Sequence, residues 1–279
     1  MVGVVLALAA SLSWGVGDFI GGVKSRSLPV LSVLLVSMPA GMMLMAVLVA
    51  IRGQGPPEAT FALYAALAGV AGAAGLAALY RGMALGAISV VAPISATAPL
   101  IPVAVGLARG ERPGALQFVG IALALIGIGL TSIEAGADGL PSRLAAGAGL
   151  GMLAALGFGV FFIAVDAASG DDALWPVLVL RATASVLVVA VVLVVRPRLP
   201  HGRADLSMLV AVGAFDVAAN GFFAAASSRG LVSIVSVLAS LYPLVTIALA
   251  YVVLHERIAQ TQRAGVVAAL AGAVLISVG

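Results

Sequence analysis

The stretch SVVAPISATAP at residues 89–99 has a counterpart in SIVSVLASLYP at residues 233–243, and this pair decides the fold. Each stretch begins with Ser and ends with Pro, and both matches fall at a separation of 144 residues. Neither stretch carries the charged face of a helix that lies against water. A motif repeated at a fixed offset indicates an internal duplication of the chain.

The same offset extends from these stretches toward both chain ends, and one inserted residue later changes it to 145. Chance matches are common in so apolar a chain, so the constant offset and the matched Gly and Pro residues carry the inference. The sequence therefore predicts two repeats, residues 1–133 and 144–279. The matched pairs include Gly3–Gly147, Gly15–Gly159, Gly69–Gly213, Gly86–Gly230, Glu111–Glu256, Gly120–Gly265 and Gly127–Gly272.

The composition indicates a membrane protein. The 279 residues are 63% hydrophobic and 9% charged, whereas soluble proteins carry about 25% charged residues. The apolar runs are long enough to cross a bilayer as helices, and none alternates as a barrel strand does. We expect an all-α integral membrane protein with ten transmembrane helices. Their expected ranges are 2–22, 29–51, 60–80, 84–107, 115–132, 144–165, 174–195, 206–227, 231–254 and 264–278.

Five helices per repeat is an odd number, so the second repeat enters the membrane from the opposite side to the first. The sequence therefore predicts two inverted five-helix repeats. Inverted repeats around a site near the bilayer midplane are typical of secondary transporters, in which one half rocks against the other. We expect transport by alternating access.

Several other classes of function lack the residues that they need. The chain has no Cys, and its two histidines lie in expected loops, so we expect no metal, no cofactor and no enzymatic activity. Residues 17–25 approach a phosphate-binding loop, but Val23 separates the last glycine from Lys24 and no strand precedes it. Positive charge does not cluster beside aromatic residues, so no nucleic-acid partner is expected. The expected partners are a small-molecule substrate, the lipid bilayer and protons as coupling ion.

Three charged residues fall inside the expected spans: Asp18, Arg181 and Asp216. A charge at the centre of a membrane helix costs about 2.5–3.5 kcal/mol on insertion scales, so such residues usually face a cavity or a partner. Arg181 is interpreted as the counter-charge to a protein carboxylate or to an anionic substrate, or as half of a structural ion pair with Asp216. Asp18 lies about five residues from the expected helix end, so it faces either the cavity or the interface.

Neighbouring polar and aromatic residues extend this candidate cavity. Asn220 lies four residues after Asp216 and shares its helix face. Trp14 and Asp18 share a face of the first helix in the same way, and Tyr80 occupies the repeat position equivalent to Ala224 on the Asn220 face.

Secondary candidates lie in the repeated stretch. Pro99 and Pro243 are expected inside the fourth and ninth helices, where a missing amide donor produces a hinge or a static kink. Ser236 and Ser240 are expected to face the cavity or a neighbouring helix on the face that Pro243 also occupies.

The positive charges predict an orientation. The loops after the odd-numbered spans hold nine Lys and Arg residues and the other loops hold four. The positive-inside rule then places the odd-numbered loops in the cytoplasm and both termini outside. The first fifteen residues lack a positively charged leader, so we interpret them as part of the first membrane helix, in the plasma or inner membrane.

These motifs, in this order, resemble the EamA domain. The resemblance rests on residues 89–99, Arg-Gly-Glu-Arg at 109–112 and the repeated His-Glu-Arg at 255–257, with Ser13-Trp14-Gly15 and Tyr80-Arg81 as further matches. Tandem EamA domains form a branch of the drug/metabolite transporter superfamily. The resemblance implies a ten-helix carrier with a central cavity, often an exporter of amino acids or other metabolites. Uptake of a sugar or nucleotide-like solute, and a membrane scaffold or sensor, remain the alternatives.

Overall fold

Helices are the regular elements of the described residues, which contain no strand. The computed structural model describes residues 1–25, 27–53, 55–56, 58–84, 94–95, 97–131, 141–170, 172–199, 202–255 and 260–279. The helices are α1 (Val2–Ser25), α2 (Val30–Arg52), α3 (Ala59–Ala84), α5 (Leu100–Ala108), α6 (Ala115–Thr131), α7 (Pro141–Ala168), α8 (Leu174–Val195), α9 (Arg203–Ser227), α10 (Val232–Ala239), α11 (Tyr242–Leu254) and α12 (Gln260–Val278).

The prediction of an all-helical membrane protein is confirmed. Eight segments of the described residues are long and apolar enough to cross a bilayer, and Ala115–Leu130 is a shorter apolar helix. One of the eight segments combines α10 and α11 as a single span. With α5 as the described part of the fourth span, the described residues contribute to ten membrane segments.

The ninth span differs from the prediction of one continuous helix over 231–254. α10 ends at Ala239, and α11 begins at Tyr242. Pro243 has no N–H group to donate to the carbonyl of Ala239, four residues earlier, so the helical ladder stops there. Leu241 instead donates to the Leu238 carbonyl at 3.3 Å, which closes a tighter turn. The expected kink is therefore a complete break.

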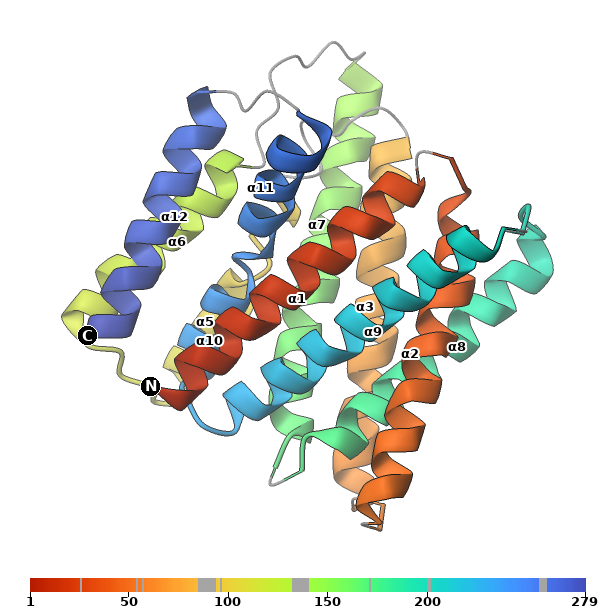
Figure 1. The fold of residues 1–279 in the computed structure, drawn as a ribbon. Coiled ribbons are helices and arrows are strands. Elements are labelled where there is room, and N and C mark those ends of the chain that lie inside the picture. Colours follow the sequence, from red (N-terminus) through yellow and green to blue (C-terminus); the bar gives the residue numbers. More distant parts are fainter. Residues whose placement is uncertain are drawn as a thin grey trace.

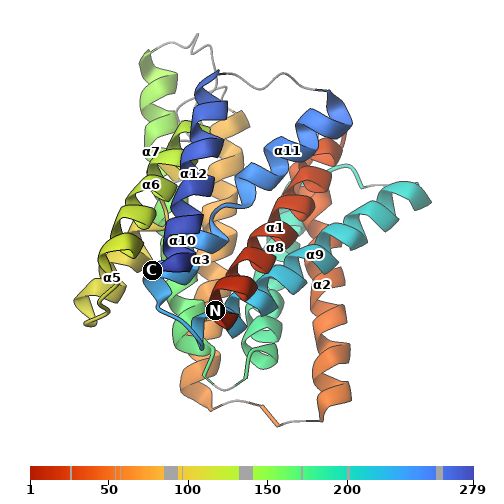
Figure 2. The same ribbon diagram turned by 60° about the vertical axis from the view of Figure 1, so that its left-hand side comes forward.

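Helices of one repeat pack mainly against helices of the other. α1 packs against α9, and its repeat equivalent α7 packs against α3; likewise α2 packs against α9 and α8 packs against α3. The pairs α6–α12 and α2–α8 lie at opposite edges of the bundle in Figure 1, and Figure 2 again shows α6 and α12 side by side. Exchanging the two repeats therefore reproduces these main helix pairs, as a two-fold relation requires.

The two ends of the bundle are named here by residues that lie at them. The N/C end holds Met1, Arg109, Arg229 and Gly279, and Figure 1 shows both chain termini there. The Lys24 end is the opposite one, where α1 ends. α1 begins at the N/C end against Arg229, whereas α7 finishes at the N/C end. The two repeats therefore run in opposite directions, so they are inverted.

Two repeat-related glycines permit the close packing between repeats. A Cβ atom on Gly213 of α9 would lie 3.0 Å from the backbone nitrogen of Gly41 in α2. A Cβ atom on Gly69 of α3 would lie 2.9 Å from the Cβ of Thr183 in α8. Any larger residue at these positions would push the helices apart, and small residues are the usual means of close approach in membranes.

Candidate functional site

Asp216 lies at the centre of a polar network between α1, α8 and α9. Trp14 donates its indole N–H to Asp216 Oδ1 at 3.0 Å. Arg181 forms an ion pair with Asp216 Oδ2. Asn220 donates to the Asp216 carbonyl at 2.6 Å and to Oδ1 at 3.2 Å. Three other residues selected from the sequence thus meet at the Asp216 carboxylate, and they come from both repeats.

The ion pair answers part of the question about Arg181. Arg181 is 6% exposed, and burying a guanidinium without a counter-charge costs several kcal/mol. Asp216 supplies that counter-charge, so the partner is a protein carboxylate. The repeat equivalents of Arg181 and Asp216 are Ser37 and Gly72, so the first repeat has no such pair and the network is asymmetric.

Asp18 continues the interior face of α1 beyond Trp14. Ala7, Ser11, Trp14 and Asp18 share one face because they are three or four residues apart. Ala7 is 0% and Ser11 3% exposed, Trp14 is half-buried and Asp18 is exposed. α1 extends to Ser25, so Asp18 lies seven residues from the helix end, farther than the five expected.

The exposure of Asp18 is not exposure to lipid. The outward face of α1 carries Val5, Leu8 and Leu12, which lie on the other side of the helix. Asp18 also lies within electrostatic range of Asp216 and Tyr242, which belong to other helices. Asp18 therefore lies on the interior side of α1, toward the Lys24 end.

Aromatic rings form the other wall of the site. The ring centroid of Trp14 lies 6.0–6.4 Å from those of Phe161, Phe162, Phe223 and Tyr242, with mostly edge-on or tilted geometry. These rings come from α1, α7, α9 and α11, so both repeats contribute. Sequence reasoning missed the three phenylalanines, because an apolar ring in a membrane helix carries no local signal of its direction. The 144-residue offset aligns Trp14 with Phe158 of the second repeat, which is the one sequence signal of an aromatic residue in that region.

The secondary candidates are placed differently from the expectation of mid-helix positions. Pro99 precedes the first residue of α5, and Pro243 lies in the first turn of α11, where a missing N–H costs no helical hydrogen bond. Ser236 and Ser240 are buried; Ser236 Oγ donates to the Val232 carbonyl at 2.7 Å. Ser240 Oγ has no hydrogen-bond partner in the described part of the chain. Tyr80 belongs to α3, and its side chain is outside the described residues.

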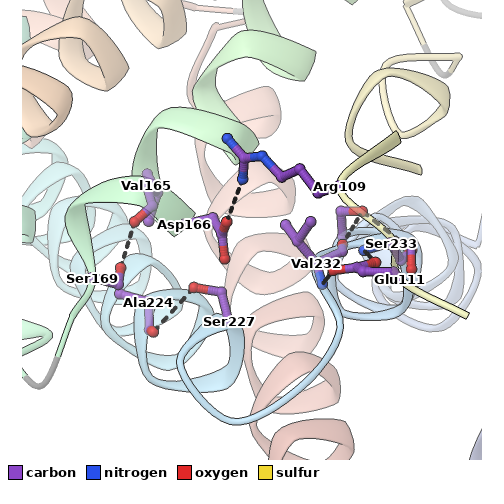
Figure 3. A network of polar contacts seen from close by, with 10 residues as sticks. Arg109, Glu111, Val165, Asp166, Ser169, Ala224, Ser227, Val232 and Ser233 are labelled. Carbon is purple, nitrogen blue, oxygen red and sulfur yellow. Dashed lines mark hydrogen bonds and ion pairs between the residues drawn. The ribbon is translucent and has the colours of Figure 1, made fainter. Parts of the chain in front are cut away.

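Polar contacts join the repeats at the N/C end (Figure 3). Arg109 donates to Asp166 Oδ2 at 3.2 Å. The Glu111 carboxylate accepts the backbone N–H groups of Val232 and Ser233 at 2.7 and 3.1 Å. A carboxylate in this position caps the helix and complements its dipole. The loop of the first repeat that follows α5 thus fastens α10 of the second repeat.

Burial differs between the two helices of the ninth span. All eight residues of α10, which begins at the N/C end, are buried, although a membrane helix normally leaves one face to lipid. α11, which runs toward the Lys24 end, has exposed residues at Tyr251, Val252 and Val253. α10 thus lies inside the bundle, whereas the end of α11 and Asp18 of α1 are exposed.

Within the described ranges, no group of three or more His, Asp or Glu residues is placed to hold a metal ion. The network around Asp216 offers charged and hydrogen-bonding groups, and Trp14 joins that network to the aromatic cluster. Polar groups beside aromatic rings suit an amphipathic small molecule.

Comparisons with known proteins agree with this architecture. The sequence matches the EamA-like transporter family over residues 1–133 and 145–278. A solved crystal structure superposes on the chain with a TM-score of 0.81 at 15% sequence identity, covering 99% of this chain and 96% of that one. At that identity the likeness concerns the fold alone. No curated protein matches the sequence.

Proposed function

The chain belongs to the EamA-like transporter family, and from this premise we propose that it is a secondary transporter that exports a small metabolite by alternating access. Members of this family, part of the drug/metabolite transporter superfamily, are transporters rather than enzymes, and the chain is a multi-pass membrane protein. The proposal assigns it to the plasma or inner membrane. The polar network around Asp216 is the single observation that carries the proposal.

That network supports transport because of its place and its cost. Charged groups in a membrane interior are expensive and usually mark a solute path. Here they lie where α1 of one repeat meets α9 of the other, with α8 packed against α9, at an interface that would move in a rocking motion. A carboxylate at Asp18 or Asp216 would also offer a proton-binding group for coupling to a pH gradient.

Flux measurements in proteoliposomes test the proposal. A competition or resistance screen in cells that lack or overexpress the protein first selects the solute. We expect that solute to move down an imposed gradient with wild-type protein, and to move much more slowly with Asp216→Asn and with Arg181→Gln at equal reconstitution. Normal flux in both variants would remove these residues from the path. No flux of any solute under any gradient would favour a scaffold or sensor.

The coupling ion and the direction need separate measurements. We expect an inward proton gradient to accelerate export, so a flux indifferent to the pH difference contradicts proton coupling. Accumulation of the solute inside cells, rather than loss from them, would favour the uptake alternative.

A further inference from the structure

The positive groups near the site are paired with carboxylates, whereas one negative group is not, and this difference indicates the charge of the substrate. Arg181 is neutralised by Asp216. At the Lys24 end, the Lys24 ammonium is held by Asp205 at 2.7 Å. Among the described residues Asp18 has no ion-pair partner, and its electrostatic neighbours are Asp216 and Tyr242, neither of which is positive. In the part of the chain that the structure describes, Asp18 is therefore a carboxylate without an oppositely charged partner.

Aromatic rings lie on the same side of α1 as that carboxylate. Trp14 is one helical turn from Asp18 on the same face of α1, and it is the hub of the aromatic cluster. Tyr242 belongs to the same cluster and lies within electrostatic range of Asp18. Ring faces attract cations, and quaternary ammonium groups are recognised by cages of this composition. The same rings repel an anion and offer apolar contact to the rest of a ligand.

The hydrogen-bonding groups of the network also favour a positively charged ligand. Asn220 directs its N–H₂ group at two acceptors of Asp216, so its Oδ1 remains a buried acceptor without a partner in the described residues. Among the described residues Arg181 Nε also lacks a hydrogen-bond partner, and it is the group that an anionic ligand would contact. However, the Arg181 guanidinium is already paired with Asp216, whose carboxylate would repel a second anion at that place.

We propose that Asp18 binds the positively charged group of the substrate, and that the Trp14 aromatic cluster holds its apolar part, so the substrate class is an amphipathic organic ammonium compound. This assignment rests on the proposed transport function and specifies its substrate. Arg181 then acts as a positioning residue that holds Asp216, and through it Trp14, in place.

Binding is measured with the fluorescence of Trp14. The chain has two tryptophans, so Trp175→Phe leaves Trp14 as the sole reporter. Purified Trp175→Phe protein is titrated with benzyltrimethylammonium, a permanent cation, and with phenylacetate, an anion with the same ring. We expect a saturable fluorescence change with the cation only. Absence of a saturable change with the cation, or saturable binding of phenylacetate that Arg181→Gln removes, overturns the proposal.

Asp18→Asn tests the assigned residue in the same background. We expect the affinity for benzyltrimethylammonium to fall at least about tenfold, because the opposite charge is lost. Asp205→Asn is the matched control, since it makes the same chemical change in a carboxylate that pairs with Lys24 outside the site. Its affinity is expected to stay within about twofold of the parent. Equal loss in both variants, or unchanged affinity in Asp18→Asn, contradicts the proposal.

Flux separates this inference from the transport function. Asp18-dependent binding of benzyltrimethylammonium without its movement in proteoliposomes would refute transport of the cation and leave the binding assignment standing. Movement of phenylacetate that is unaffected by Asp18→Asn would support transport and overturn the assignment.

Discussion

Asp216 combines three contacts that no single partner could supply. It holds the charge of Arg181, accepts the indole N–H of Trp14, and is bound by Asn220 one turn away on α9. Its side chain is nevertheless 30% exposed, so the ion pair lies at the boundary between the protein interior and the open space. At this scale the pair has two effects, since it stabilises the fold and fixes the direction of Trp14.

The ion pair predicts a non-additive effect on stability. Arg181→Gln leaves the Asp216 carboxylate without a counter-charge, and we expect the free energy of unfolding to fall by about 2–3 kcal/mol. Adding Asp216→Asn removes that unpaired charge, so the double variant is expected to regain most of the loss. Thermal unfolding in detergent measures both. A double variant that is less stable than Arg181→Gln would contradict the interpretation of the pair.

At the scale of elements, the break between α10 and α11 and the glycine contacts decide how the repeats fit together. α10 is held at its start by Glu111 and stops where Pro243 cannot donate a hydrogen bond. The break places Tyr242 against Trp14. The close contact of Gly213 with α2 brings α9, and with it Asp216, next to the other helices of the site.

Two glycines of α9 predict opposite responses to alanine. Gly213→Ala introduces a Cβ atom 3.0 Å from a backbone nitrogen of α2, and overpacking of this kind costs about 1–3 kcal/mol. Gly221→Ala is the matched control because nothing lies within 4 Å of its added Cβ, and alanine is the better helix former by about 1 kcal/mol. We expect a lower melting temperature for Gly213→Ala only. Equal melting temperatures would show that α2 and α9 separate freely.

The Glu111 cap predicts a local effect at the N/C end. Glu111→Gln removes the negative charge from the start of α10, and we expect a loss of about 1 kcal/mol in stability. Glu58→Gln makes the same change at an exposed residue of the same end and is expected to be neutral within about 0.5 kcal/mol. Melting temperatures compare the two. Equal melting temperatures for the two variants would mean that the Glu111 cap does not stabilise the start of α10.

For the whole molecule, the exposure of Asp18 and the burial of α10 predict a bundle that is open at the Lys24 end and closed at the N/C end. Two ion pairs between the repeats at the N/C end are partly exposed: Arg109–Asp166 at 3.2 Å and Arg52–Asp172 at 2.9 Å. Exposed ion pairs of this kind contribute about 0–1 kcal/mol each. These two pairs therefore add little to the free energy that holds the repeats together at that end.

Accessibility to a thiol reagent tests the open end, since the natural chain contains no Cys. Gly22 lies one turn beyond Asp18 and is exposed, whereas Ser11 on the same face is 3% exposed. We expect a membrane-impermeant maleimide to label Gly22→Cys rapidly and Ser11→Cys slowly. Rapid labelling of Ser11→Cys without labelling of Gly22→Cys would reverse the assignment of the open end.

The same reagent tests orientation. The charge count predicts that the Lys24 end is cytoplasmic, so Gly22→Cys is expected to react in inside-out vesicles and not in intact cells. A reporter fused to the C-terminus should then signal outside. A cytoplasmic signal from that reporter would contradict the predicted orientation.

The sequence alone determined the membrane class, the helix positions, the duplication and its inversion, because run length, charge and a fixed offset are properties of the chain read along its length. It also selected Trp14, Asp18, Arg181, Asp216 and Asn220, because charged and polar groups are conspicuous in an apolar span.

Only the tertiary structure decided which of these residues meet. The partner of Arg181, the cluster of phenylalanines around Trp14 and the cap on α10 depend on which helix faces touch, and an apolar run carries no record of that. The break at Ser240 was hidden for a related reason, because a broken helix keeps the hydropathy of a continuous one. The exposure of Asp18 likewise follows from helix packing, since the same residue would be buried if other helices packed over it.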